Sequence, residues 1–93
     1  MNDRLDFSIE GVKKSVENMK VANNENVKIK EAFLDKINNT IANEWTTASG
    51  QVAVDELRNF VNVKYQEYIN FINTKIGSIE NVVIPALNNI NNA

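Results

Sequence analysis

Apolar residues recur at alternating steps of three and four through most of the second half of the chain. The row consists of Val54, Leu57, Val61, Tyr65, Tyr68, Ile72, Ile76, Ile79, Val83, Leu87 and Ile90. This spacing brings successive side chains to one face of an α-helix, and it persists over about five heptads. The pattern therefore predicts one long helix that begins near residue 50.

Pro85 stands inside this row, close to the end of the sequence. Proline lacks the backbone N–H that an unbroken helix needs, and it biases the preceding residue, Ile84, away from helical geometry. We therefore expect the second helix to span about residues 50–84, with a kink or an end near Val83. Residues 85–93 are expected to form a frayed tail.

The first half of the chain carries a weaker pattern of the same kind. Its apolar row consists of Ile9, Val12, Val16 and Met19, and then of Val27, Phe33 or Leu34, Ile37, Ile41 and Trp45. The polar stretch Ala22–Asn26 separates the two parts and contains neither glycine nor proline. We expect one helix over about residues 8–43, whose phase shifts at this stretch, with a break into two shorter helices as the alternative. Asp6 or Ser8 is the expected N-cap, and residues 1–7 are expected to be loose.

The two patterns are separated by a short stretch that is rich in turn and capping residues. Residues 44–49 contain the only tryptophan, Trp45, and the cap-forming Thr47 and Ser49, and Gly50 follows them. We expect Trp45 to pack as a core residue at the apex of this turn. The sequence thus predicts an all-α fold in which residues 1–93 form a single domain, a hairpin of two long antiparallel helices joined at Trp45–Gly50.

The second helix has a wider apolar face than a contact between two helices requires. We expect the residues of the seam between the two helices of one chain to be Leu57, Val61, Tyr68, Ile72 and Ile79. A second row would then remain in water, and it consists of Phe60, Phe71 and Val82. Exposed apolar stripes of this kind usually mark a partner surface, so we predict a dimer that forms a four-helix bundle. If the second row does not form the interface, the expected surface lies on the first helix at Val12, Val16 and Met19.

The composition argues against several classes of function. The chain has no cysteine and no histidine, which removes the commonest general base and the thiolate and imidazole metal ligands. No serine has a base nearby in the sequence, and the Glu31–Asp35 pair is better explained as a solvated face than as a cation site. We expect no enzyme activity, no cofactor and no metal. A net charge of −2 with interspersed signs argues against nucleic-acid binding, and neither a signal peptide nor a membrane span is predicted.

A chain of about a hundred residues with two long helices and a tryptophan at the central turn resembles the WXG, or ESAT-like, family of bacterial type VII secretion substrates. The family has Trp-x-Gly in the turn, whereas this chain has Trp45-Thr46-Thr47 and its glycine only at Gly50. The family also often carries Tyr-x-x-x-Asp/Glu near the end of the second helix. Neither tyrosine of the present chain fits this motif, because Ile69 follows Tyr65 and Ile72 follows Tyr68 at that spacing.

The resemblance implies a protein that is made in the bacterial cytoplasm and secreted folded, without a cleavable signal peptide, as an effector or as an escort. Its partner would be a second copy, a related hairpin, a larger secreted toxin or the secretion machinery. Two other classes remain open. One is a polymerising subunit of a secretion needle, whose turn usually contains proline, and the other is an intracellular helical adaptor or chaperone.

Overall fold

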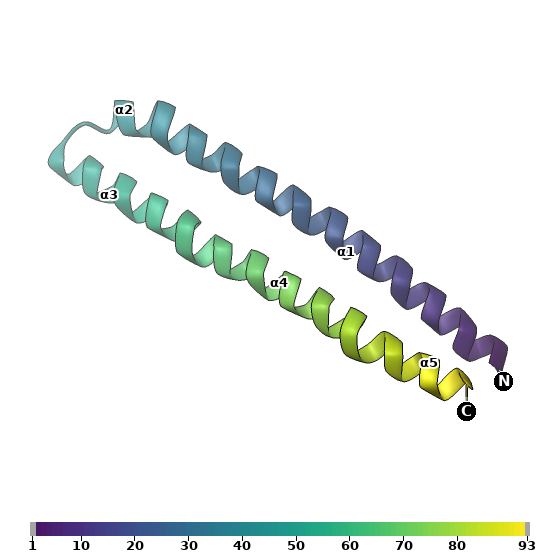
Figure 1. The fold of residues 1–93 in the computed structure, drawn as a ribbon. Helices are drawn as coiled ribbons and strands as arrows, with labels where there is room; N and C mark the ends of the chain where they lie inside the picture. The colour runs from purple at the N-terminus through teal and green to yellow at the C-terminus, as the bar shows by residue number, and fades with distance from the viewer. Residues whose placement is uncertain (1, 93) are drawn as a thin grey trace. The chain divides into compact units, whose positions relative to one another are not determined.

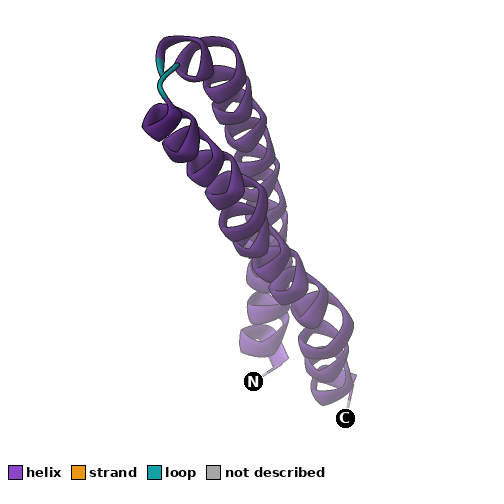
Figure 2. Cartoon of the chain, turned by 90° about the vertical axis from the view of Figure 1, so that its left-hand side faces the viewer, coloured by secondary structure: helices purple, strands orange, loops and turns teal. Residues whose placement is uncertain are grey.

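The computed structural model describes the backbone of residues 2–92 and the side chains of residues 9–92. All of this chain except the short loop around Trp45 is helical, which confirms the predicted all-α helical hairpin (Figures 1 and 2). The first arm consists of α1 (Asn2–Lys36), the π-helical turn η1 (Ile37–Ile41) and α2 (Ala42–Glu44). The second arm consists of α3 (Ala48–Asn59), η2 (Phe60–Tyr65), α4 (Gln66–Ser78), η3 (Ile79–Val83) and α5 (Ile84–Asn92), where η2 and η3 are again π-helical.

The first helix starts earlier than expected. Helix α1 begins at Asn2, so residues 2–7 are helical in their backbone rather than loose. Asp6 and Ser8 lie inside α1, so the expectation that one of them is its N-cap is wrong. Helix α1 continues without interruption through Ala22–Asn26, as predicted.

The expected shift in phase at Ala22–Asn26 is wrong. The buried side chains of the first arm are Ile9, Val16, Asn23 and Ile37, which all fall on one seven-residue repeat. The sequence pattern seemed to shift because a polar residue, Asn23, occupies a buried position of that repeat. Hydrophobic spacing alone cannot detect such a position.

Contacts within the chain divide it into two compact units. The first unit comprises the described parts of residues 1–23 and 71–93, in which Ile9, Val16 and Ile76 are the buried apolar side chains. In this unit Asn23 is only 3% exposed, and its Nδ2 donates a hydrogen bond of 2.8 Å to Oδ1 of Asn73. Asn73 itself is exposed, so only the Asn23 side of this contact is buried, and a shift of either segment would break this hydrogen bond at a buried amide.

Charged side chains at the surface of the first unit also link its two segments. The Nζ of Lys20 lies 2.8 Å from a carboxylate oxygen of Glu80 and 3.5 Å from one of Glu17. The hydrogen bond to Glu80 raises the pKa of the Lys20 ammonium, whereas desolvation opposes this change and the charge of Glu17 adds to it. Lys20 therefore stays protonated and bridges α1 to η3.

The second unit, residues 24–70, contains the turn and a small apolar cluster. Ile37, Val54 and Val61 are its buried centre, and the residues packed against them are Leu34, Ile41, Ala42 and Leu57. At the edges of this cluster, polar side chains of the two arms are hydrogen-bonded to each other. Lys30 Nζ donates to Oε1 of Gln66 at 2.6 Å, and Nε of Arg58 donates to Oδ1 of Asn38 at 2.8 Å.

The π-helical turns change which residues of the second arm are buried. Val54, Val61, Ile69 and Ile76 are buried, so the steps between them are seven, eight and seven. The step of eight begins inside η2, where i→i+5 hydrogen bonding accommodates one more residue than an α-helical turn does. The prediction that Tyr68 lies in the seam is therefore wrong, since Tyr68 is 54% exposed and its neighbour Ile69 is 2% exposed.

The expectation that the helix ends near Val83 with a frayed tail after it is wrong for the described residues, whereas the alternative of a kink there stays a prediction. Helix α5 contains Pro85 and continues to Asn92. It follows η3, in which the N–H of Ile84 donates to the carbonyl of Ile79, five residues earlier. Pro85 therefore lies within a continuous run of helix, where proline lacks the N–H for one hydrogen bond. The wide turn η3 ends directly before α5 and changes the hydrogen-bond register at this point.

The hydrogen bond between the buried Asn23 and the exposed Asn73 generates the first prediction. Replacing Asn23 with leucine should raise the urea midpoint of unfolding, because a buried amide is exchanged for an apolar side chain. The same change should allow the two segments of the first unit to slide. Paired spin labels on cysteines introduced at the exposed positions Lys14 and Asn81, measured by electron resonance, should then show a broader distance distribution than in the parent protein. A lower midpoint with an unchanged distribution would contradict this role of Asn23.

Candidate partner-binding surface

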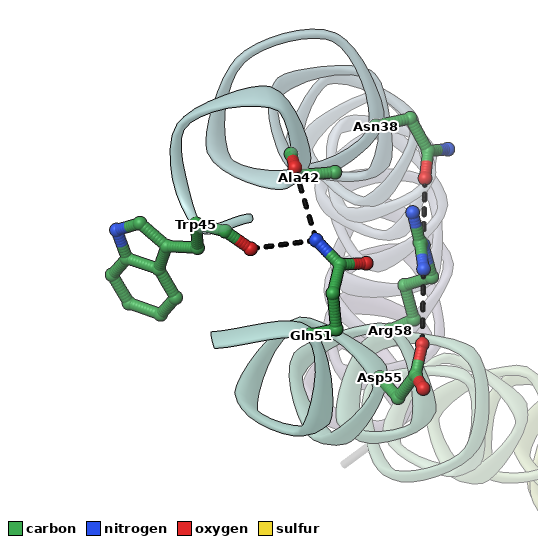
Figure 3. Close-up of polar contacts among 6 residues, drawn as sticks. All are labelled: Asn38, Ala42, Trp45, Gln51, Asp55 and Arg58. Atoms are coloured by element: carbon green, nitrogen blue, oxygen red, sulfur yellow. Dashed lines mark hydrogen bonds and ion pairs between the residues drawn. The ribbon is translucent and has the colours of Figure 1, made fainter. Parts of the chain in front are cut away.

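The turn between the two arms is held by backbone and side-chain hydrogen bonds within the second unit. Thr47 is the N-cap of α3, and its side-chain oxygen accepts from the N–H of Gly50 at 3.0 Å. Nε2 of Gln51 donates to the carbonyl of Trp45 at 2.6 Å and to that of Ala42 at 3.2 Å (Figure 3). These contacts satisfy carbonyl groups at the end of the first arm that have no partner within the helix.

Gly50 is required at this turn because of space. A Cβ atom at this position would lie 2.9 Å from the carbonyl oxygen of Trp45 and 3.0 Å from the Cβ of Trp45. It would also lie 3.1 Å from Oγ1 of Thr47. The backbone of Trp45 and the first turn of α3 thus approach each other as closely as they do only because residue 50 has no side chain.

The expectation that Trp45 is a core residue at the apex is wrong. Its side chain is 45% exposed, and Figure 3 shows the indole ring pointing away from Gln51 and out of the turn. The backbone of Trp45 ends α2 with φ −96° and ψ 71°, and its N–H donates to the carbonyl of Ile41. This backbone conformation directs the ring outward, while Ile41 and Ala42 pack on the cluster beneath.

The row that was expected to face a partner is exposed in the single chain. Phe60 is 57% exposed, Phe71 is 58% exposed and Val82 is 64% exposed. Among the expected seam residues, Val61 is buried, and Leu57, Ile72 and Ile79 are half-buried. Of the alternative surface on the first arm, Val16 is buried in the first unit and is thus not available, whereas Val12 and Met19 are half-buried.

Two concave apolar surfaces accompany these residues, one in each unit. In the first unit an open groove of about 520 Å³ is lined by Gly11, Val12, Ser15, Ile79 and Val83. In the second unit a hollow of about 140 Å³ is lined by Ile29, Lys30, Phe33, Phe60, Val61 and Tyr65. We call the latter the Phe33–Phe60 hollow. Sequence analysis missed the contribution of Ile29, because this residue lies outside the main apolar row of the first arm.

The residues described here offer little for chemistry. No group of three or more acidic, histidine or cysteine side chains among residues 9–92 is placed to hold a metal ion. None of the helices in the described part of the chain is both long and apolar enough to span a membrane. The described surface carries large exposed apolar side chains, among them Phe60, Phe71 and Val82.

The close approach at Gly50 generates the second prediction. Gly50→Ala should lower the free energy of unfolding by about 1–3 kcal/mol, because the new methyl group overlaps the backbone of Trp45. Gly11→Ala is the matched control, since a Cβ there meets no atom within 4 Å. In a helix interior this control should stabilise the protein by about 0.5–1 kcal/mol. Thermal melts of both variants check the pair, and equal shifts in melting temperature would contradict the role of Gly50.

Comparison with known proteins found no match to this chain among family models, curated proteins or solved structures.

Proposed function

We propose that this chain is a WXG-like protein of a bacterial type VII secretion system, exported as a folded helical hairpin and acting as an effector or as an escort. In this proposal it works as a dimer that forms a four-helix bundle. The observation that carries the proposal is the row of large apolar side chains that a single hairpin leaves in water, above all Phe60 and Phe71.

The size of the exposed apolar surface supports association. Ile29 is 52% exposed, Phe33 is 46% exposed and Phe60 is 57% exposed, and all three line the Phe33–Phe60 hollow of the second unit. At roughly 200 Å² for a whole aromatic side chain, and somewhat less for isoleucine, they leave on the order of 300 Å² of apolar surface in water. Monomeric soluble proteins rarely leave larger contiguous patches, and patches of this size are often functional. A dimer would cover this surface.

The turn supports the resemblance to the WXG family. The family pairs a tryptophan with a nearby glycine, and here a Cβ atom at Gly50, five positions after Trp45, would lie only 2.9 Å from the carbonyl oxygen of Trp45. The glycine is thus displaced in sequence while it still lies against the tryptophan. The chain lacks the family's Tyr-x-x-x-Asp/Glu motif, so we propose that recognition by the export machinery relies on the exposed indole of Trp45.

The third prediction concerns Trp45. The ring of Trp45 is about half exposed. Trp45→Ala should therefore lower the free energy of unfolding by less than the loss for a buried aromatic residue, which is about 3–5 kcal/mol. The variant should keep its helix content in circular dichroism while its export into the culture medium falls at least tenfold. The matched control is Val52→Ala, another exposed apolar residue of the second unit. A loss of export in the control as well would remove the specific role of Trp45.

The same secretion assay tests the proposal as a whole. A dimer in the culture supernatant that disappears when the ATPase of the type VII system is deleted supports it. Concentration-dependent filaments would instead support a needle subunit, and retention in the cell with one co-purified client would support an adaptor. Each of the last two results would contradict the proposal.

The fourth prediction separates association from folding by two adjacent residues. Phe60→Glu places a charge on the exposed row and should split the dimer while the hairpin keeps its helices. Val61→Glu places the same charge at a side chain that is 2% exposed, and it should unfold the second unit. Sedimentation and circular dichroism distinguish the two results. Unchanged dimerisation of Phe60→Glu would place the interface elsewhere.

A further inference from the structure

A lysine occupies a position in the buried row of the first arm. The buried residues Val16, Asn23 and Ile37 fall on one seven-residue repeat, and Lys30 is the member of that repeat between Asn23 and Ile37. Lys30 is half-buried. A charged side chain at such a position costs desolvation that an apolar residue would avoid. The charge of Lys30 is therefore a feature of the second unit that packing between the arms does not explain.

The ammonium of Lys30 has a neutral hydrogen-bond partner. Its Nζ donates to Oε1 of Gln66 at 2.6 Å, and Nε2 of Gln66 in turn donates to Oδ1 of Asn70 at 2.9 Å. None of the ion pairs among residues 9–92 includes Lys30, whereas the exposed Lys28 lies 3.4 Å from a carboxylate oxygen of Glu25. An ammonium group has three protons, and the contact with Gln66 uses one of them. Lys30 can therefore donate to a further acceptor, and an anion would balance its charge.

Lys30 also lines the Phe33–Phe60 hollow, whose lining residues all belong to the second unit. The most buried of them is Val61, and Ile29, Phe33 and Phe60 are about half exposed. The volume of the hollow is about 140 Å³. An apolar cavity of about 150 Å³ accepts benzene in another protein, so one aromatic ring is of suitable size. Phenylalanine walls favour such a ring, because aromatic pairs add stabilisation beyond the buried area.

We propose that the Phe33–Phe60 hollow binds a small aromatic carboxylate, which is a single six-membered ring with a carboxylate on a short linker. The ring lies against Ile29, Phe33 and Phe60, and the carboxylate accepts hydrogen bonds from the ammonium of Lys30. A carboxylate is favoured over a neutral acceptor because charge-assisted hydrogen bonds are roughly twice as strong as neutral ones. A cationic ligand is disfavoured by the charge of Lys30.

The hydrogen bond to Gln66 does not by itself account for a lysine at this position. A polar residue in a buried row can fix the alignment of two helical segments. A neutral side chain is sufficient for this purpose, as Asn23 shows in the same row of the first arm. The positive charge beside apolar walls is the additional feature, and an anionic aromatic ligand uses both.

This site goes beyond the proposed function and does not depend on it, because residues of one unit of one chain form it. The hollow shares Phe33 and Phe60 with the surface that a second copy would cover, so the ligand and the dimer compete for this surface. The two proposals can fail separately. Ligand binding is measured at the residues of the hollow, and association is measured by sedimentation.

The test titrates the full chain with sodium phenylacetate and follows the side-chain methyl signals of Ile29 and Val61 by nuclear magnetic resonance. Phenylacetamide is the neutral probe of the same shape. Both signals should shift with phenylacetate, with a Kd on the order of 1 mM for a ligand of about ten non-hydrogen atoms. Phenylacetamide should bind at least about tenfold more weakly, because its contact with Lys30 is not charge-assisted on both sides.

Three variants assign the binding to the hollow. Lys30→Gln should weaken phenylacetate binding at least about tenfold and leave phenylacetamide binding unchanged. Lys28→Gln is the matched control, because it removes the same charge outside the lining of the hollow, and it should leave both affinities unchanged. Ile29→Trp fills the hollow and should abolish the binding of both probes. Circular dichroism should show the helix content of the parent protein in each variant.

Methyl signals of Ile29 and Val61 that do not move at about 20 mM phenylacetate, well above the expected Kd, would overturn the site in any state of association. Equal affinities of the parent protein for the acid and the amide would also overturn it, and this comparison decides the result even if Lys30→Gln does not fold. Unequal affinities that Lys30→Gln leaves unchanged would overturn the role of Lys30. A dimer that persists with phenylacetate bound would contradict only the placement of the dimer interface on Phe60.

Discussion

Each unit of this protein consists of two helical segments that contact each other along one narrow seam, and its other features follow from this limit. Such a seam can bury only one row of side chains on each segment. The buried apolar residues among those described are all isoleucine or valine: Ile9, Val16, Ile37, Val54, Val61, Ile69 and Ile76. These β-branched side chains have few rotamers, so they lose little entropy in a tight contact. The larger aromatic side chains do not fit into this row and remain at the surface.

A narrow seam of similar apolar side chains does not by itself fix how two helical segments align along their axes. Polar contacts between the segments fix this alignment. Asn23 pairs with Asn73 in the first unit, and Lys30 pairs with Gln66 in the second. Each pair costs desolvation that an apolar residue would avoid, and each is satisfied at one alignment of its two segments. The turn adds a third constraint in the second unit, where Gln51 holds two carbonyl groups of the first arm.

The same limit connects the fold to the proposed function. Phe33, Phe60 and Phe71 cannot be covered within a chain whose helices meet along one seam, so they are available to a partner. Trp45 is exposed for a different reason, since the backbone conformation with which it ends α2 leaves its ring pointing out of the turn. The exposed phenylalanines and the exposed indole of Trp45 are therefore separate features of the surface.

The sequence by itself determined the all-α hairpin, the continuity of α1 and the location of the turn, because helical spacing, capping residues and the absence of glycine and proline are local signals. It also separated the exposed Phe60, Phe71 and Val82 from the buried Val61. Only the tertiary structure decided that Asn23 is buried, that Ile69 replaces Tyr68 in the seam and that Trp45 points outward. A buried amide requires a partner fifty residues away, and the π-helical turn η2 adds a residue that a fixed helical period cannot anticipate. The direction of the indole depends on the backbone conformation of Trp45 at the end of α2, which helical spacing does not specify.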